Sequence, residues 1–312
     1  MAEKFIVEVS PHIRSNNSVQ SIMRDVIIAL MPALFVSVYV FGLRTLFVVL
    51  LSVSTAVLTE HLFCLAVKKQ STVLDLSAVV SGLLFAFVIP PGLSFILVII
   101  GSAIAMLLGK LIFGGLSHNP FNPALVGRAV LLASWPIAMT TWYKPFWYKY
   151  SIDSITCATP LAIVKMQLAD NLPSYKDLFF GFRSGCIGEI SILALIIGAM
   201  YLLIRRIIDL YIPLSYIVTV AVISFFMGAN PLFHVLSGGL VLGAFFMATD
   251  YSTSPLLPFS KILFGIGCGV LTVLIRLKGG FPEGVCYSIL IMNMLTPILD
   301  YYVKPFRYGG RI

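Results

Sequence analysis

Residues 45–58 read TLFVVLLSVSTAVL, and the apolar run that contains them extends from 45 to 67. A helix needs about 20 apolar residues to cross the hydrocarbon core of a bilayer. This stretch therefore predicts a membrane-spanning helix. Runs of similar length recur along the chain. We expect helices at 21–42, 45–67, 76–89, 93–112 and 123–139, and again at 187–204, 211–227, 234–249, 259–277 and 284–299.

The composition supports an all-α, polytopic integral membrane protein. Of the 312 residues, 59% are hydrophobic and only 11% are charged, whereas a soluble domain carries about 25% charged residues. We expect no signal peptide, because no basic segment, apolar core and small-residue cleavage site follow one another at the N-terminus. The net charge of +8 does not indicate nucleic-acid binding, because the basic residues stand at helix ends and in short loops, as membrane orientation requires.

Ten spans place both termini on one side of the membrane. Basic residues concentrate in the segments on the side of the termini, apart from Arg44, Arg276 and Lys278, and this pattern predicts cytoplasmic termini. We divide the chain into a cytoplasmic N-terminal arm (1–20), a first transmembrane repeat (21–139), an extracytoplasmic loop (140–186), and a second transmembrane repeat with a short basic tail (187–312).

The two halves share a weak internal repeat. Residues 81–85, ahead of two prolines, resemble 237–240, ahead of Thr249 and Asp250, and residues 113–116 resemble 278–281. Because five spans is an odd number, the second copy would be inverted in the membrane, as in folds built on a pseudo-two-fold axis in the bilayer plane. Chance similarity between glycine-rich helices is the alternative.

A polar interruption, GGLSHNPFNP at 114–123, separates two apolar runs. Its prolines and its glycine pair cannot continue a helix. It is either an ordinary cytoplasmic turn or a re-entrant segment that lines a cavity. In the second case Asn119 and Asn122 contact a cofactor or an ion, and Arg128 lies near a cofactor edge.

Acidic residues in or beside apolar runs are candidates for an ion path. Asp75 opens the third span and Asp250 ends the eighth, although Asp75 can also be a helix cap. We expect Asp25 to pair locally with Arg24. The five cysteines and four histidines are scattered, so we assign no metal, and we find no catalytic grouping. Redox chemistry would therefore need a cofactor.

The hydroxyl-rich stretch from Asp153 to Pro160 reads DSITCATP. Taken alone, it is a turn that caps a helix beginning near Leu161. Its pattern Asp-x-x-Thr-x-Ala-Thr also resembles the site at which flavin transferases join FMN to a threonine through its phosphate. The resemblance makes Thr159 the attachment residue and Asp153, Thr156 and Ala158 the recognition positions. Cys157 stands where the pattern usually has Gly or Ser.

Segments along the whole chain resemble one family, which contains the RnfD subunits of Rnf-type ferredoxin:NAD oxidoreductases and the NqrB subunits of sodium-pumping NADH:quinone oxidoreductases. The segments that carry the resemblance are 10–14, 23–26, 113–124, 153–160, 188–191, 237–250 and 281–285. The short N-terminal arm favours the Rnf type.

The resemblance implies a subunit of a cation-translocating oxidoreductase in the bacterial cytoplasmic (inner) membrane. It would carry covalent FMN as an electron relay, with a second, non-covalent flavin such as riboflavin in the helical bundle, and couple electron flow to Na⁺ or H⁺ movement. Its partners would be the other components of the Rnf complex (RnfA, RnfB, RnfC, RnfE and RnfG), an FMN transferase and the lipid bilayer. The alternatives are an NqrB-type component of the sodium-pumping enzyme, a passive urea-channel-like transporter, and a structural anchor for redox partners.

Overall fold

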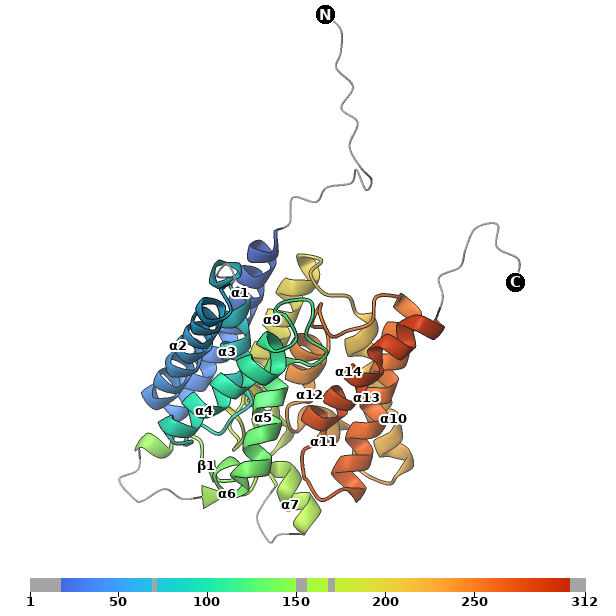
Figure 1. The fold of residues 1–312 in the computed structure, drawn as a ribbon. Coiled ribbons are helices and arrows are strands. Elements are labelled where there is room, and N and C mark those ends of the chain that lie inside the picture. The colour runs from blue at the N-terminus through green and yellow to red at the C-terminus, as the bar shows by residue number, and fades with distance from the viewer. Residues whose placement is uncertain (1–17, 69–71, 150–155, 168–171, 304–312) are drawn as a thin grey trace, which may run out of the picture.

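The computed structural model describes residues 18–68, 72–149, 156–167 and 172–303. These residues form a bundle of helices (Figure 1), and their one β-ladder joins the two-residue strands β1 (Trp142–Tyr143) and β2 (Thr156–Cys157) in antiparallel register. The all-α prediction is confirmed.

The first half of the bundle consists of five main helices. They are α1 (Val19–Phe41), α2 (Leu43–Ala66), α3 (Ser77–Phe87), α4 (Phe95–Met106) and α5 (Pro123–Ser134). A 3₁₀ turn, η1 (Val73–Asp75), precedes α3, and α4 continues into a π-helical turn, η2 (Leu107–Leu111). Gly42 separates α1 from α2 with a φ of 85°, a left-handed conformation that favours glycine.

The middle of the chain is built from short elements. They are α6 (Pro136–Met139), β1, η3 (Trp147–Lys149), β2, α7 (Pro160–Met166), α8 (Tyr175–Phe180) and η4 (Ile187–Glu189). The second half contains α9 (Ile192–Ile204), α10 (Tyr211–Phe226), α11 (Pro231–Leu236), α12 (Leu240–Leu242), η5 (Gly243–Met247), α13 (Pro258–Lys278) and α14 (Val285–Tyr302).

Several predicted helices are interrupted. The helix expected at 234–249 is wrong, because the segment divides into the end of α11, a non-helical step at 237–239, α12 and the π turn η5. The helix expected at 123–139 breaks at Trp135, since Pro136 cannot donate a backbone hydrogen bond. The helix expected from 187 begins at Ile192.

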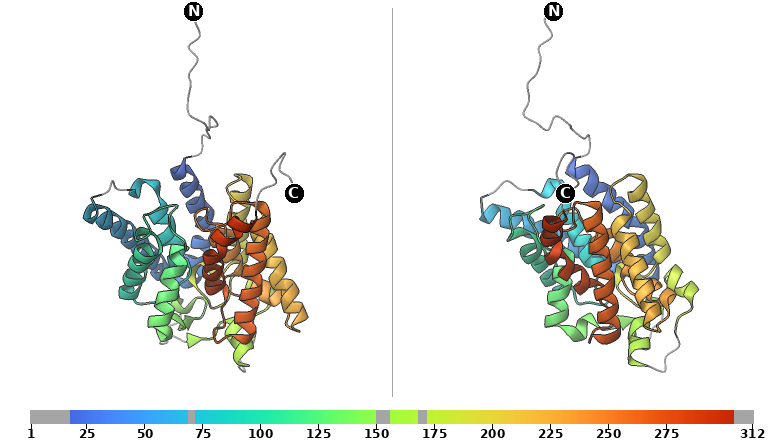
Figure 2. Two further views of the ribbon diagram at one scale, coloured as in Figure 1. Left: turned by 45° about the vertical axis from the view of Figure 1, so that its right-hand side comes forward. Right: turned by 90° about the vertical axis from the view of Figure 1, so that its right-hand side faces the viewer.

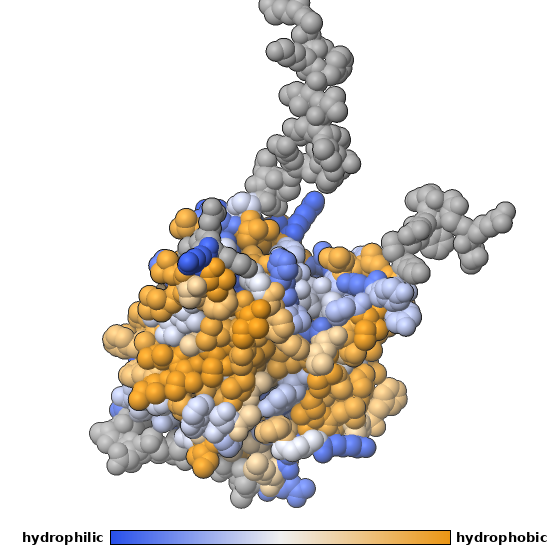
Figure 3. All heavy atoms as spheres, in the orientation of Figure 1, coloured by the Kyte–Doolittle hydropathy of each residue, from blue (hydrophilic) through white to orange (hydrophobic). Residues whose placement is uncertain are grey.

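Within the described part of the chain, three helices, α1, α2 and α13, are long and apolar enough to cross a membrane, and five further apolar helices are shorter. Hydrophobic residues dominate the middle of the face seen in Figure 3. Over the bundle as a whole, many large hydrophobic side chains are exposed, such as Phe35 (71%) and Phe226 (81%), as expected for side chains in contact with lipid.

Close contacts join the two halves. Helix α1 packs against α9, and α5 packs against α14. At Gly198 of α9 an added Cβ would lie 1.9 Å from the backbone oxygen of Ala29 in α1, so only glycine allows this approach. The beginning of α1 and the end of α14 lie on one face of the bundle, and α6, α7 and β1 lie on the opposite face (Figures 1 and 2).

Candidate cofactor and ion sites

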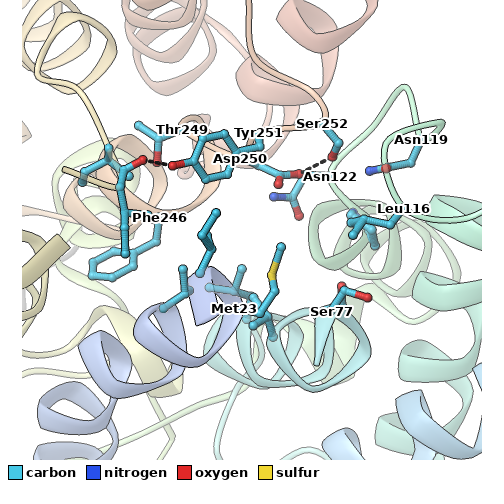
Figure 4. A pocket seen from close by; sticks show the side chains of 18 of the residues that line it. Met23, Ser77, Leu116, Asn119, Asn122, Phe246, Thr249, Asp250, Tyr251 and Ser252 are labelled. Atoms are coloured by element: carbon cyan, nitrogen blue, oxygen red, sulfur yellow. Dashed lines mark hydrogen bonds between the residues drawn. The ribbon is translucent and has the colours of Figure 1, made fainter. Parts of the chain in front are cut away.

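A cavity opens where the interrupted segments of the two halves meet. Its volume is about 70 Å³. We call it the asparagine cavity. Its polar wall includes Ser77, Lys110, Asn119, Asn122, Asp250 and Ser252, and apolar side chains from α1, α3 and η5 complete it (Figure 4).

The turn before α5 places both asparagines at this cavity. Gly114 and Gly115 adopt φ values of 117° and 106°, in the left-handed region that favours glycine. Asn122 then caps α5, because its Oδ1 accepts hydrogen bonds from the backbone nitrogens of Ala124 (3.1 Å) and Leu125 (3.4 Å). Its Nδ2 donates to the backbone oxygen of Met247 at 3.4 Å, which ties the first interrupted segment to the second.

Asn119 has a buried side-chain oxygen with unused hydrogen-bonding capacity. Its Nδ2 donates to the backbone oxygen of Phe121 at 3.0 Å, but its buried Oδ1 has no partner among the described residues. A buried polar atom without a partner costs free energy. A ligand with a donor group would remove that cost.

Asp250 follows η5 and lines the same cavity as the two asparagines (Figure 4). Its Oδ2 accepts hydrogen bonds from the hydroxyls of Ser252 (3.0 Å) and Thr253 (3.4 Å). The structure thus brings Asn119, Asn122 and Asp250 to one cavity.

Asp75 reaches the same wall through a buried polar network. Its Oδ1 accepts hydrogen bonds from the backbone nitrogen (2.8 Å) and the hydroxyl (2.5 Å) of Ser77. The Ser77 hydroxyl accepts from Lys110 Nζ at 2.6 Å, and the same Nζ lies 2.9 Å from Glu60 Oε2. Sequence analysis missed this ion pair, although each charged residue interrupts an apolar run.

Arg128 lies at a different cavity from the two asparagines. Its guanidinium donates to Cys186 Sγ at 3.0 Å, to the Val88 backbone oxygen and to Glu283 Oε2. It lines a second cavity of about 300 Å³, which we call the arginine cavity. Other lining residues are Trp142, Ala158, Ala162, Glu283 and Tyr287.

The loop with the predicted flavin site borders the arginine cavity. Thr159 is 3% exposed and caps α7, since its Oγ1 accepts a hydrogen bond from the Ala162 backbone nitrogen at 3.2 Å. The Ala158 oxygen accepts from the Ser184 hydroxyl at 2.8 Å. Thr156 pairs with Tyr143 in the β-ladder. Asp153 lies outside the described residues.

Cys186, Glu189 and Glu283 offer ligand atoms within 4.8 Å of one another, a grouping that sequence analysis missed. Arg128 donates to two of the three residues. Arg183 and Arg276 also lie within electrostatic reach of Glu283. Because these arginines together offset the two carboxylates, we interpret the cluster as a structural brace between α5 and the segments before α9 and α14.

Comparison with known proteins finds full-length similarity. A family model described as the NQR2, RnfD, RnfE family matches residues 6–309. The chain is 48% identical to the RnfD-type component of the Na(+)-translocating ferredoxin:NAD(+) oxidoreductase complex of Acetobacterium woodii, over 97% of this chain and 95% of that protein. It is 43% identical to the corresponding component of the proton-translocating ferredoxin:NAD(+) oxidoreductase complex of Clostridium ljungdahlii, over 98% and 97% of the two chains. It is 36% identical to the corresponding component of the ion-translocating oxidoreductase complex of Vibrio cholerae, over 98% and 99%.

Proposed function

This chain belongs to the NQR2, RnfD, RnfE family, and from that membership we propose that it carries FMN on Thr159 as an electron relay. It is a membrane subunit of an ion-translocating ferredoxin:NAD oxidoreductase complex. The observation that carries the proposal is the placement of Thr159. The residue stands at the end of a motif that resembles a flavinylation site, one residue from the wall of the arginine cavity.

The chemistry of the arginine cavity fits a flavin. Bound FMN supplies reversible electron transfer. The ring edges of a flavin are polar and its faces are apolar, and the cavity combines Arg128 and Glu283 with apolar walls from Trp142 and Tyr287. An ester oxygen at Thr159 keeps a lone pair, so it can still accept the hydrogen bond from the Ala162 backbone.

The burial of Thr159 adds a condition on maturation. At 3% exposure the hydroxyl is out of reach of a second protein. An FMN transferase therefore reaches it before α7 packs or while the loop is open.

Mass spectrometry of the complex co-expressed with its FMN transferase tests the covalent site. We expect the parent subunit to gain the mass of FMN minus water and the Thr159→Ala variant to show no gain. Thr140→Ala is the matched control, because Thr140 lines the same cavity and, among the described residues, its hydroxyl bonds only to the backbone oxygens of Pro136 and Ile137. An adduct on Thr159→Ala would refute the assignment.

The asparagine cavity is our proposed place for the second, non-covalent flavin. The partnerless Asn119 Oδ1 and the apolar wall suit a ring edge that carries an N–H group, and the cavity of about 70 Å³ would have to widen to admit the whole ring. We expect Asn119→Leu to lose acid-extractable flavin but to keep the covalent adduct. His118→Ala, a change at the exposed neighbour on the same turn, should keep both flavins.

We propose that the coupling cation, Na⁺ or H⁺, passes Asp250 at this cavity, and that Asp75 positions Ser77 in its wall. Carboxylate and hydroxyl oxygens are suited to both ions. Asp250→Asn should retain both flavins and electron transfer while ion uptake into proteoliposomes falls. Unchanged uptake would remove Asp250 from the path.

A further inference from the structure

Helix α9 ends in a turn that usually requires glycine. The backbone nitrogen of Arg206 donates to the Leu203 oxygen at 3.0 Å, and that of Ile207 donates to the Leu202 oxygen at 2.9 Å. These two bonds define a Schellman motif, whose residue after the cap is left-handed and most often glycine. Arg206 occupies that position with a φ of 54°. Glycine fits this position without strain, so a glycine substitution removes the side chain and leaves the turn intact.

An apolar groove lies beside Arg206. Its volume is about 760 Å³, and it is bounded by the end of α9, the connection to α10, the first half of α10 and one residue of α13. The apolar residues that line it are Leu203, Ile208, Leu210, Leu214, Val218 and Ile262. Leu214 and Val218 are 58% and 49% exposed. The groove is therefore open at the outer surface of the bundle, where Figure 1 places α10 beside α13.

The charges around the groove leave one cation available. Asp209 pairs with Lys261 at 2.5 Å, and Asp25 pairs with Arg205 at 3.0 Å. The Arg206 side chain is exposed and makes no hydrogen bond or ion pair with another described residue. Of the two charged residues that line the groove, Asp209 is paired with Lys261, and Arg206 is left to meet a ligand.

The position of the groove matches the geometry of a membrane lipid. The turn lies on the face that carries the beginning of α1 and the end of α14 (Figures 1 and 2). From Tyr211 to Val218 the lined surface runs about 10 Å along α10, away from that face. A charged rim above an apolar channel complements an anionic head group and its acyl chain.

We propose that this groove binds an anionic phospholipid, with its phosphate on Arg206 and an acyl chain along α10. A transmembrane helix of another protein in the complex could cover the apolar surface, but it would need an acidic residue at the depth of Arg206. The lipid satisfies the charge and the apolar channel together. The site is distinct from both cavities described above, and it does not depend on either flavin.

The test measures lipid binding to the complete, detergent-purified complex after mild delipidation. Phosphatidylglycerol or phosphatidylcholine is titrated in, and bound lipid is counted by native mass spectrometry. We expect Arg206→Gly to bind phosphatidylglycerol about five-fold more weakly, the change typical of one basic residue at a membrane surface. Arg206→Lys should restore most of the binding. Phosphatidylcholine should bind weakly and equally to all variants.

Lys68→Gly is the matched control. Lys68 is also an exposed basic residue, it follows α2 with a φ of 57°, and it does not line the groove. The Lys68→Gly variant should bind phosphatidylglycerol as tightly as the parent protein does. Glycine suits the left-handed position, so neither glycine variant should lose thermal stability.

Three results would overturn the proposal. The first is full phosphatidylglycerol affinity in Arg206→Gly, and the second is an equal loss in Lys68→Gly. The third is efficient cross-linking of a photoreactive residue at position 214 to another protein of the complex, which would show that protein covers the groove.

Discussion

The buried charges of this protein are held by residues distant in sequence. Asp25 does not pair with Arg24 as expected; its carboxylate accepts hydrogen bonds from Tyr201 and Arg205 on α9. Glu60 and Lys110 pair across two helices. The sequence marks such residues as charged positions in apolar runs, but only packing decides which residues pair. By contrast, the cap at Thr159 is local, and the predicted helix start near Leu161 is confirmed at Pro160.

A double-mutant cycle measures the interaction free energy between Glu60 and Lys110. Both side chains are at most 2% exposed, so removal of one partner leaves the other charge buried and unpaired. We expect Glu60→Gln or Lys110→Met alone to destabilise the subunit by about 3–5 kcal/mol, and the double variant to lose less than either single one. Thermal unfolding of the purified complex checks this order. Additive losses would mean that the two charges do not interact.

Lys165 anchors the helix that follows the flavin site. Its ammonium donates to the backbone oxygens of Ile275 (3.3 Å), Gly279 and Phe281 (2.7 Å) at the end of α13. We expect Lys165→Met to release α7, seen as at least ten-fold faster amide hydrogen exchange across 160–166. Lys176→Met, at an exposed position on α8, should leave exchange there unchanged. If amide exchange across 160–166 is as slow in Lys165→Met as in Lys176→Met, apolar packing alone holds α7.

At the scale of elements, apolar run length located most helices to within a few residues. The prediction of 211–227, for example, differs from α10 by one residue. The breaks were harder to predict. The glycine pair at 238–239 and Pro136 indicate two of these interruptions, but the long apolar runs around them favour a continuous helix. The π turns η2 and η5 have no such signal, because a π turn depends on what the extra residue contacts.

A substitution at Gly198 tests the close contact between α1 and α9. An alanine there would place its Cβ 1.9 Å from the Ala29 oxygen, so α9 and α1 must separate. We expect Gly198→Ala to lower stability by about 1–3 kcal/mol, despite the better helix propensity of alanine. Gly280→Ala is the control, since nothing lies within 4 Å of its added Cβ. A higher melting temperature for Gly198→Ala would contradict the close approach.

At the scale of the whole molecule, the inverted repeat stays a prediction. The α1–α9 and α5–α14 contacts are the pairs that a two-fold relation between halves would bring together. The arrangement of the ends is easier to test. The described chain begins and ends on one face, opposite to α6 and α7 (Figure 1).

Cysteine labelling in a Cys157→Ser background tests this topology, because the other four cysteines are buried. We expect a membrane-impermeant maleimide to label Lys144→Cys in intact cells. Ser18→Cys and Val303→Cys should react only in inside-out vesicles. This arrangement requires an odd number of membrane crossings between each end of the chain and the opposite face. Labelling of all three variants from the same side would rule it out.

Helix α5 connects the two cavities, and this connection has an electrical consequence. Pro123 lines one cavity and Leu132 lines the other, about 14 Å apart along the helix axis. The hydrocarbon core is about 30 Å thick, so if α5 runs along the membrane normal, this separation covers nearly half of the membrane dielectric. With a redox cofactor in each cavity, every electron that moves between them crosses a matching share of the transmembrane voltage. The electron step would then be electrogenic by itself, and the membrane potential would speed or slow it before any cation moved.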